Sequence, residues 1–475
     1  MTRRIVYRSI ALAFAFLSPL FAQSPDSARV SQYRDILQRM MITGMESCTA
    51  HQLLTELCTT VGPRLSGSPN AEKAVQWAKK KMEDLGFDRV WLEPVMVPHW
   101  VRGPVEKATV ATNSSRKEIP LTVCALGGSI ATPAAGVTAE VVEVKSFDEL
   151  RALGDKAKGK IIFFNRPMER GRFSTFDAYG RAVNQRAQGA IEAARAGGVA
   201  ALVRSMTTRF DDVPHTGMMV YNDTIPKVPT AAVSTVGANL LSAMLEKDPN
   251  LRLRLTLSCE TLPDVESANV VGEIVGSEKP DEVIVVGGHF DSWDKGQGAH
   301  DDGAGSMQSI EAVRLMKEIG LKPKRTIRAV LYMNEENGAR GGQAYAAKQR
   351  PGETPIAAIE SDAGGFSPLG FGVTADSESF ATIARWAPVL DAISAGRITR
   401  GGGGVDVGPL RERGAIIIGL RVEGQRYFDY HHSDSDTIDK VNERELELGA
   451  IAMAMLSTIL SEEDITPAGT HVPTH

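Results

Sequence analysis

Histidine and acidic residues gather directly after an apolar run in the second half of the chain. The stretch Val283–Gly305, V-I-V-V-G-G-H-F-D-S-W-D-K-G-Q-G-A-H-D-D-G-A-G, carries His289, Asp291, Asp301 and Asp302. A short apolar run that ends in glycine predicts a buried strand. Ligands of open α/β sheets bind beyond the carboxyl ends of such strands. The stretch therefore predicts a metal site at the rim of a sheet.

Residues of the same kinds occur at three later points of the chain. Glu335 and Glu336 end one apolar run, Asp362 follows another, and a later loop contains His431 and His432. Strands buried on both faces consist mainly of Val, Ile and Leu, so this grouping is not expected by chance. Zinc binds imidazole nitrogen and carboxylate oxygen, and two ions can share one carboxylate. Two imidazoles and three carboxylates suit a pair of zinc ions.

Each residue alone has a simpler structural explanation. Asp301 and Asp302 could cap a helix, and Glu335 with Glu336 could form a solvated turn. Asp362 before Ala-Gly-Gly could form an Asx turn. Their joint occurrence at predicted strand ends favours the metal site over these separate explanations.

Other sequence motifs and the remaining histidines give less information about function. The chain contains no H-E-x-x-H zinc helix and no G-x-S-x-G nucleophile elbow. The glycine run at residues 401–404 lacks the Lys-Ser/Thr of a phosphate loop, and we expect a close backbone approach or a mobile loop there. His300 beside Asp301 is expected to face away from the site. The remaining histidines do not belong to a group of histidine and acidic residues, and they are interpreted as non-functional: His51, His99, His215, His471 and His475.

Strand-like and helix-like segments alternate around the candidate site. After residue 266, strands are predicted at 282–286, 326–333, 356–359 and 415–420, and helices at 307–319, 377–393 and 442–460. This alternation predicts an α/β fold with a mixed, mostly parallel sheet and helices on both faces. Before it, helices are predicted at 27–59 and 70–85, followed by a strand at 89–97. Pro94 places that strand at an edge.

Composition separates a middle segment from the rest. Residues 126–262 contain their own short strands and one helix at 187–196, without a cluster of histidine and carboxylate. We interpret them as an inserted α+β module that shapes access to the site. The alternative is that they continue a single sheet. If the middle segment is an insert, residues 27–125 and 263–465 form the two parts of the main domain.

The N-terminus predicts export. Arg3, Arg4 and Arg8 precede an apolar run, which is typical of a signal peptide at residues 1–22 and is too short to span a membrane. An uncleaved anchor is the alternative, and the arginine pair also fits twin-arginine export. We expect a secreted or periplasmic protein with no membrane span after signal removal.

The net charge and the cysteine content narrow the functional class of the protein further. The net charge of −5 gives no reason to expect a nucleic-acid partner. The four cysteines lie away from the motifs, so a catalytic thiol is not expected. They are interpreted as buried thiols or as one structural disulfide.

Four motifs together resemble the co-catalytic two-zinc aminopeptidase family. They are G-G-H-F-D-S-W-D-K-G-Q-G-A-H-D-D-G-A-G, N-E-E-N-G, E-S-D-A-G and H-H-S-D-S-D-T. Thr60–Ser68 and Glu93–Trp100 are similar to its plasma glutamate carboxypeptidase branch. The resemblance covers nearly the whole mature chain. It implies a zinc-peptidase fold with a protease-associated domain inserted at 126–262, most clearly at Lys158–Asn165.

The resemblance also implies the metal ligands. His289 and Asp362 would bind one zinc ion, Glu336 and His432 would bind the other, and Asp301 would bridge the two. The expected cofactor is therefore two Zn²⁺ per chain.

Two further roles follow from the resemblance. Glu335 would be the general base that takes a proton from a metal-bridging water, and Asp291 would orient the first histidine ligand through its other ring nitrogen. His432 is preferred to its neighbour His431, because the family ligand lies four residues before the Asp of Asp-Thr, here Asp436.

The implied function is a secreted zinc exopeptidase that hydrolyses dipeptides or short peptides. Dipeptidase, aminopeptidase and carboxypeptidase action all remain open, and the chain could form a homodimer. One alternative is a catalytically silent, receptor-like binding protein, whose sign would be lost ligands. A second is a glutaminyl cyclase-like transferase, which needs one zinc ion.

Overall fold

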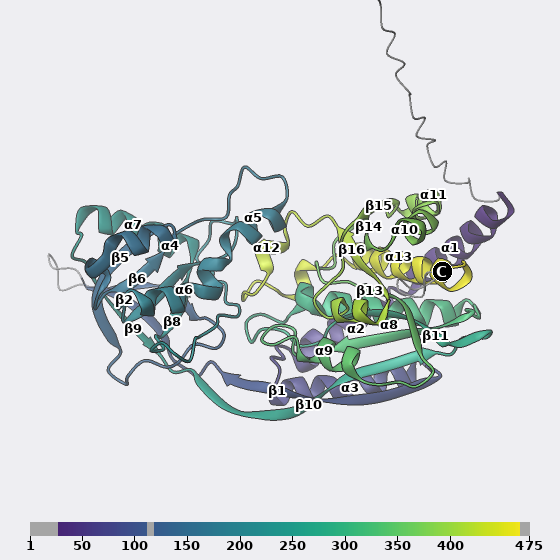
Figure 1. Cartoon of the computed structure of the whole chain (residues 1–475), viewed down its shortest axis with the longest axis horizontal. Coiled ribbons are helices and arrows are strands. Elements are labelled where there is room, and N and C mark those ends of the chain that lie inside the picture. The colour runs from purple at the N-terminus through teal and green to yellow at the C-terminus, as the bar shows by residue number, and fades with distance from the viewer. Residues whose placement is uncertain (1–26, 112–117, 466–475) are drawn as a thin grey trace, which may run out of the picture.

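Two eight-stranded sheets organise the chain (Figure 1). The computed structural model describes residues 27–111 and 118–465. The expected signal peptide and two of the histidines, His471 and His475, lie outside these ranges. Among the described residues, no helix has the length and apolar character needed to cross a bilayer.

The first sheet has a parallel centre with antiparallel strands towards its edges. Its order is β1 (Arg89–Val101), β10 (Glu260–Ile274), β12 (Arg325–Tyr332), β11 (Lys279–His289), β13 (Thr354–Glu360), β16 (Ile416–Val422), β14 (Pro368–Thr374) and β15 (Arg397–Arg400). The pairs β12–β11, β11–β13 and β13–β16 are parallel. The expected mixed sheet is confirmed, and β1, which contains Pro94, lies at its edge.

Helices cover both faces of this sheet. One face packs on α1 (Ser27–Ser47), α2 (Thr49–Glu56), α3 (Pro69–Asp84), α8 (Ala304–Glu318) and α13 (Glu443–Glu462). The other packs on α9 (Arg340–Ala347) and a 3₁₀ helix, Gly408–Arg413. The helix expected at 377–393 is broken into α10 (Ser377–Ala384), α11 (Ala387–Leu390) and a 3₁₀ turn. Pro388 lies in the first turn of α11, where its missing N–H prevents a continuous helix.

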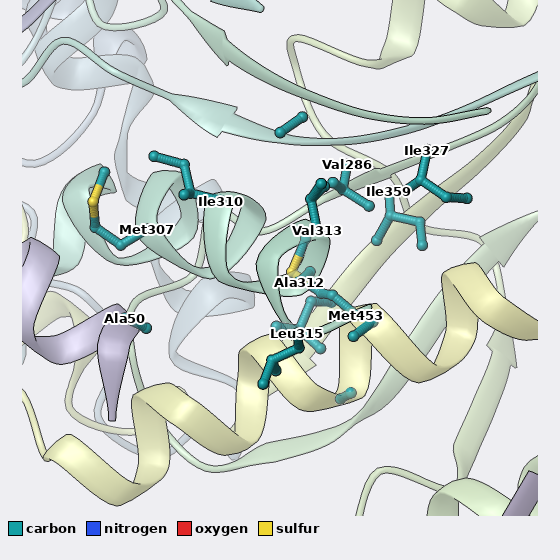
Figure 2. Packing of buried hydrophobic residues seen from close by; sticks show 14 of the residues in the cluster. Ala50, Val286, Met307, Ile310, Ala312, Val313, Leu315, Ile327, Ile359 and Met453 are labelled. Atoms are coloured by element: carbon teal, nitrogen blue, oxygen red, sulfur yellow. The ribbon is translucent and has the colours of Figure 1, made fainter. Parts of the chain in front are cut away.

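Helix α8 packs at the centre of the first body, where it is buried between the sheet and α13. Figure 2 shows Val313 facing Val286 and Ile359 of the sheet, with Leu315 against Met453 of α13. Buried polar residues of α8 also have partners, since Gln308 donates to the backbone oxygen of Leu446 and Glu311 accepts from Arg314. The element that begins just after the candidate aspartates is therefore held firmly in place.

The second sheet lies in a separate body, so the alternative of one continuous sheet is wrong. Its order is β3 (Glu118–Leu121), β2 (Glu106–Ala111), β9 (Arg252–Leu257), β5 (Val137–Val144), β6 (Ile161–Phe164), β7 (Ala200–Arg204), β8 (Thr230–Val233) and β4 (Val123–Ala125). Three of these strands, β2 to β4, precede residue 126, where the sequence analysis began the insert. β2 pairs with β9 and with β3, and β4 pairs with β8. Pairing between strands so far apart in the chain leaves no local sign in the composition.

Among the described residues, four α-helices accompany the second sheet, where the sequence analysis expected one. They are α4 (Phe147–Leu153), α5 (Thr175–Ala182), α6 (Asn184–Arg195) and α7 (Thr235–Lys247). The expected helix is α6. The other three begin at the serine N-caps Ser146, Ser174 and Ser234, a signal that the sequence carries.

Aromatic residues join the two bodies. Helix α5 lies beside α12 (Tyr427–Tyr430) of the first body (Figure 1). The rings of Phe176 and Tyr427 stack at 5.2 Å, and those of Tyr179 and Phe428 stack at 4.6 Å between centroids. This contact fixes the second body over the loop that follows α12. All four cysteines are free thiols in the described chain.

The core between α8 and α13 contains a buried acid whose ionisation should affect stability. Burial, and then the charge of Glu311, raises the pKa of Glu447 to about 9. The folded chain therefore keeps a proton that the unfolded chain loses near its usual pKa of about 4.3. Because the folded state binds more protons between these values, the free energy of unfolding falls as pH rises through them.

We predict that chemical denaturation shows this decline between about pH 6 and about pH 9. The Glu447→Gln variant should show a smaller decline, because its amide cannot ionise. The exposed Glu443→Gln change on the same helix is the control and should leave the slope unchanged. An unchanged slope in Glu447→Gln would contradict the assignment.

Candidate metal centre

Three parallel strands end at the same edge of the first sheet. Strand β11 ends at His289, β12 ends shortly before Glu336, and β13 ends shortly before Asp362. His289 lies opposite Tyr332 in the β11–β12 register, so these strand ends are level with each other. The convergence of distant candidates is thus a consequence of parallel pairing.

Asp302, two residues before α8, stabilises this edge of the sheet. Its Oδ2 accepts a hydrogen bond from the backbone N–H of His289 at 3.1 Å, and its Oδ1 accepts one from Gly305 at 2.9 Å. A Cβ at Gly288 would lie 2.3 Å from Asp302 Oδ2, so the close approach requires glycine there. The G-G-H and D-D-G-A-G motifs are therefore parts of one packing contact.

Asp301 lies between the two candidate histidine ligands. Its Oδ1 is 3.1 Å from His289 Nε2, and its Oδ2 is 3.2 Å from His432 Nε2. Glu336 Oε2 is 2.9 Å from His432 Nε2, and Asp362 Oδ1 is 3.7 Å from His289 Nε2. The five expected ligands thus form two groups that share one carboxylate.

The two adjacent histidines differ in their distance from this cluster. His431 Nε2 is 3.8 Å from Asp301 Oδ2, against 3.2 Å for His432, and the two rings stack at 3.5 Å between centroids. His432 has a φ of 60°, which is uncommon for a residue with a side chain. This backbone turn presents His432 to Glu336, so the geometry favours His432 as the ligand.

Asp291 makes contacts that differ from the expected one. His289 Nδ1 is 3.0 Å from the backbone oxygen of Asp291 and 3.8 Å from its carboxylate. The carboxylate Oδ1 instead accepts hydrogen bonds from the N–H groups of Asn334 at 2.7 Å and Glu335 at 3.0 Å. Asp291 therefore orients the histidine through its backbone and holds the Glu335 segment through its side chain.

Arg64 was missed by the sequence analysis, although it lies in the Thr60–Ser68 motif. It is fully buried, and its guanidinium donates to the backbone oxygens of Phe290 at 2.6 Å and of Gln297 and Gly298 at 2.9 Å. These bonds close the loop between the first histidine ligand and the bridging aspartate. The sequence feature that could have indicated Arg64 is its position inside a loop of Gly, Pro and Ser residues.

Asp436 was also missed as a site residue. Its two oxygens accept hydrogen bonds from the N–H groups of His300 at 2.7 Å and Asp301 at 3.1 Å. The His300 ring faces away, as expected, and stacks between Phe366 at 4.4 Å and Tyr430 at 5.2 Å. The Asp-Thr motif therefore fixes the backbone that carries the bridging carboxylate.

The second body reaches the histidine loop through His215, which was interpreted as non-functional. His215 Nδ1 lies 2.7 Å from the backbone oxygen of His431, and the N–H of Thr216 donates to the oxygen of His432 at 2.9 Å. Burial lowers the pKa of His215 to about 4, so the neutral ring donates through Nδ1. His215 is a positioning residue of the site.

The electrostatics of the cluster suit bound cations. Burial raises the pKa of Glu336 to about 7 and raises that of Asp362 and Glu335 above their usual values. Burial alone would lower the pKa of His432, but Glu336 and Asp301 raise it to about 9. Crowded buried carboxylates are costly unless positive charge accompanies them. Imidazole nitrogen with carboxylate oxygen is the donor set that zinc takes.

A cavity of about 270 Å³ opens on the cluster. Its walls come from both bodies, because it is lined by candidate ligands and α12 on one side and by the second body on the other. The residues from the second body are Phe176, Tyr179, Arg186 and Met218. The glycine run at residues 401–404 makes a close backbone approach, since a Cβ at Gly404 would lie 1.8 Å from the carboxylate of Glu360.

Comparison with known proteins points to one family. The model described as Peptidase family M28 matches residues 269–457, which contain every candidate ligand. Carboxypeptidase Q of Homo sapiens is 37% identical over 430 residues, covering 90% of this chain and 89% of that protein.

Solved structures agree. A Peptidase M28 precursor from Shewanella amazonensis has 35% identity and a TM-score of 0.88, covering 92% of this chain and 98% of its own. A zinc aminopeptidase from Bacillus subtilis shares the fold with a TM-score of 0.62 at 20% identity, covering 88% of this chain and 98% of its own. The coverage and identity of these relatives establish that the chain belongs to peptidase family M28, a family of metallopeptidases.

Proposed function

We propose that the chain is a zinc-dependent exopeptidase that holds two zinc ions and hydrolyses dipeptides or other short peptides. The observation that carries the proposal is Asp301, whose two oxygens face His289 at 3.1 Å and His432 at 3.2 Å. A carboxylate in this position suits two cations that share it. The names of two relatives, carboxypeptidase Q and zinc aminopeptidase, support the same activity.

The ligand sets follow from the two groups around Asp301. His289 and Asp362 would hold one ion, and Glu336 and His432 would hold the other. When bound, zinc would polarise the scissile carbonyl and make water more acidic.

Glu335 is the proposed general base. It lines the cavity beside Glu336 but makes no ion pair among the described residues, so its carboxylate is available to substrate and water. The carboxylate takes the proton of the attacking water and returns it to the leaving amine. Asp291 holds the Glu335 N–H at 3.0 Å and so keeps the base in place.

The size of the cavity suits short peptides. Its volume of about 270 Å³ is near the lower end of small-molecule pockets. The second body covers one side of it, and we propose that this body is a protease-associated domain. The acidic cluster also suits the free amino group of a short peptide. The signal pattern at residues 1–22 supports action outside the cell or in the periplasm.

Replacing the proposed base separates catalysis from metal binding. We predict that Glu335→Gln lowers kcat by about 10²–10⁴-fold or more, because the amide cannot accept a proton. Zinc content, measured by mass spectrometry of the metal-loaded protein, should be unchanged. The exposed Glu278→Gln variant, in the turn just before β11, is the control. Substantial turnover in Glu335→Gln would show that another group is the base.

Metal titration tests the ligand assignment. After chelation, the chain should take up two zinc ions, and the His432→Ala variant should take up one. The His431→Ala variant is the matched neighbour and should still take up two. A single ion in the unaltered chain would favour the cyclase-like alternative, and none would favour the receptor-like one.

A further inference from the structure

The loop between β11 and the bridging aspartate makes a second contact with the second body. Its three consecutive contact residues are Trp293, Asp294 and Lys295. Trp293 belongs to the buried cluster that packs on the second sheet, and the two charged side chains form ion pairs with segment 102–106, which leads from β1 into β2. This contact is separate from the aromatic one between α5 and α12.

Trp293 fills a space that the second body leaves open. Its side chain is 2% exposed, and its ring meets that of Trp100 edge-on at 6.4 Å between centroids. A Cβ at Gly127 would lie 1.8 Å from an atom of the Trp293 ring, so only glycine fits there. The backbone of Gly127 bonds with that of Gly217 and of Met219 at 3.0 Å each. The indole is therefore enclosed next to the loop that bonds the two histidines.

Arg102 is the centre of the charged part of this contact. It is buried, and its guanidinium donates to both carboxylate oxygens of Asp294, at 2.6 and 2.8 Å. The same group donates to the carboxylate of Glu106 at 3.0 Å and to the hydroxyl of Thr216 at 3.2 Å. A two-point bond between guanidinium and carboxylate fixes orientation as well as distance. One side chain thus joins the metal-bearing loop, the link between the bodies and the loop at Thr216.

Both ligands of one proposed metal ion contact these residues. The backbone N–H of Trp293 donates to Glu336 Oε1 at 3.2 Å, while Oε2 faces His432 Nε2 at 2.9 Å. The Trp293 ring lies 5.8 Å from the His432 ring, and the N–H of Thr216 donates to the His432 backbone oxygen at 2.9 Å. Hydrogen bonds from outside the ligand set orient metal ligands and tune the affinity for the ion.

The ligands of the other proposed ion are held within the first body. The N–H of His289 donates to Asp302, and its Nδ1 lies 3.0 Å from the backbone oxygen of Asp291. Within residues 27–111 and 118–465, no hydrogen bond or ion pair joins the side chain of His289 or Asp362 to the second body. The two metal positions are therefore built differently, one inside the first body and one between the bodies.

We propose that the second body sets the zinc affinity of one metal position, that of Glu336 and His432. Trp293 and Arg102 are the positioning residues through which it acts. The inference rests on the proposed function, because it concerns one of two zinc ions. If the bond between Arg102 and Asp294 is lost, the 293–295 loop can shift, and its N–H no longer fixes the Glu336 carboxylate. The ligand is then ordered only on binding, which lowers affinity at this position and leaves the other unchanged.

Zinc titration of the full chain against a competing chelator tests the inference, with each position measured alone. His289→Ala leaves only the position between the bodies, and His432→Ala leaves only the other. Adding Asp294→Asn should raise the zinc dissociation constant roughly 10–100-fold in the His289→Ala chain and leave it unchanged in the His432→Ala chain. Adding Arg102→Met should act in the same way. The exposed Asp148→Asn change on α4 is the control and should alter neither constant.

A general loss of stability would weaken zinc binding in both chains. An equal loss in both, or no loss in the His289→Ala chain, would therefore overturn the inference. In the His289→Ala chain, adding Asp294→Asn to Arg102→Met should cost no further affinity, because the bond between them is already absent. A further loss would show that the two residues act separately and would contradict the inference.

Hydrolysis of a dipeptide by the zinc-loaded unaltered chain tests the proposed function separately. If Asp294→Asn weakens only the position between the bodies while the unaltered chain cleaves no dipeptide, the inference stands and the proposed function fails. If the unaltered chain cleaves dipeptides while Asp294→Asn weakens both positions equally, the proposed function stands and the inference fails.

Discussion

The crowding of carboxylates at one sheet edge is the constraint on which the rest of the structure depends. Asp301 stands between His289 at 3.1 Å and His432 at 3.2 Å, with Glu336 and Asp362 beyond them. Such a cluster is unstable unless cations occupy it or the scaffold holds the acids together. The scaffold holds them together, because α8 is buried on the sheet. The side chains of Asp302, Asp436 and Asp291 also accept hydrogen bonds from the backbone N–H groups of His289, Asp301 and Glu335.

The second body contributes residues to the cavity and contacts the histidine loop. Its loop at His215 and Thr216 bonds the backbone of the two histidines, and its α5 stacks on α12. Arg186 then adds a positive charge to a cavity that is otherwise acidic.

Most of the first sheet could be predicted from the sequence, because its strands are short apolar runs, and the five residues that the family resemblance suggests as ligands lie close together in the structure. The boundaries of the second sheet could not, since β2 pairs with a strand far along the chain. The contacts of His215 and Arg186 with the histidine loop span 216 and 246 residues. The dual contacts of Asp291 likewise depend on packing between β11 and β12, which residue types do not reveal.

The central claim is that one carboxylate is shared by two metal ions. Crystals of the zinc-loaded chain, measured at the zinc absorption edge, test it most directly. We expect two anomalous peaks, one on each side of Asp301, next to His289 and His432 respectively. A single peak, or peaks that leave Asp301 without a metal neighbour, would contradict the account.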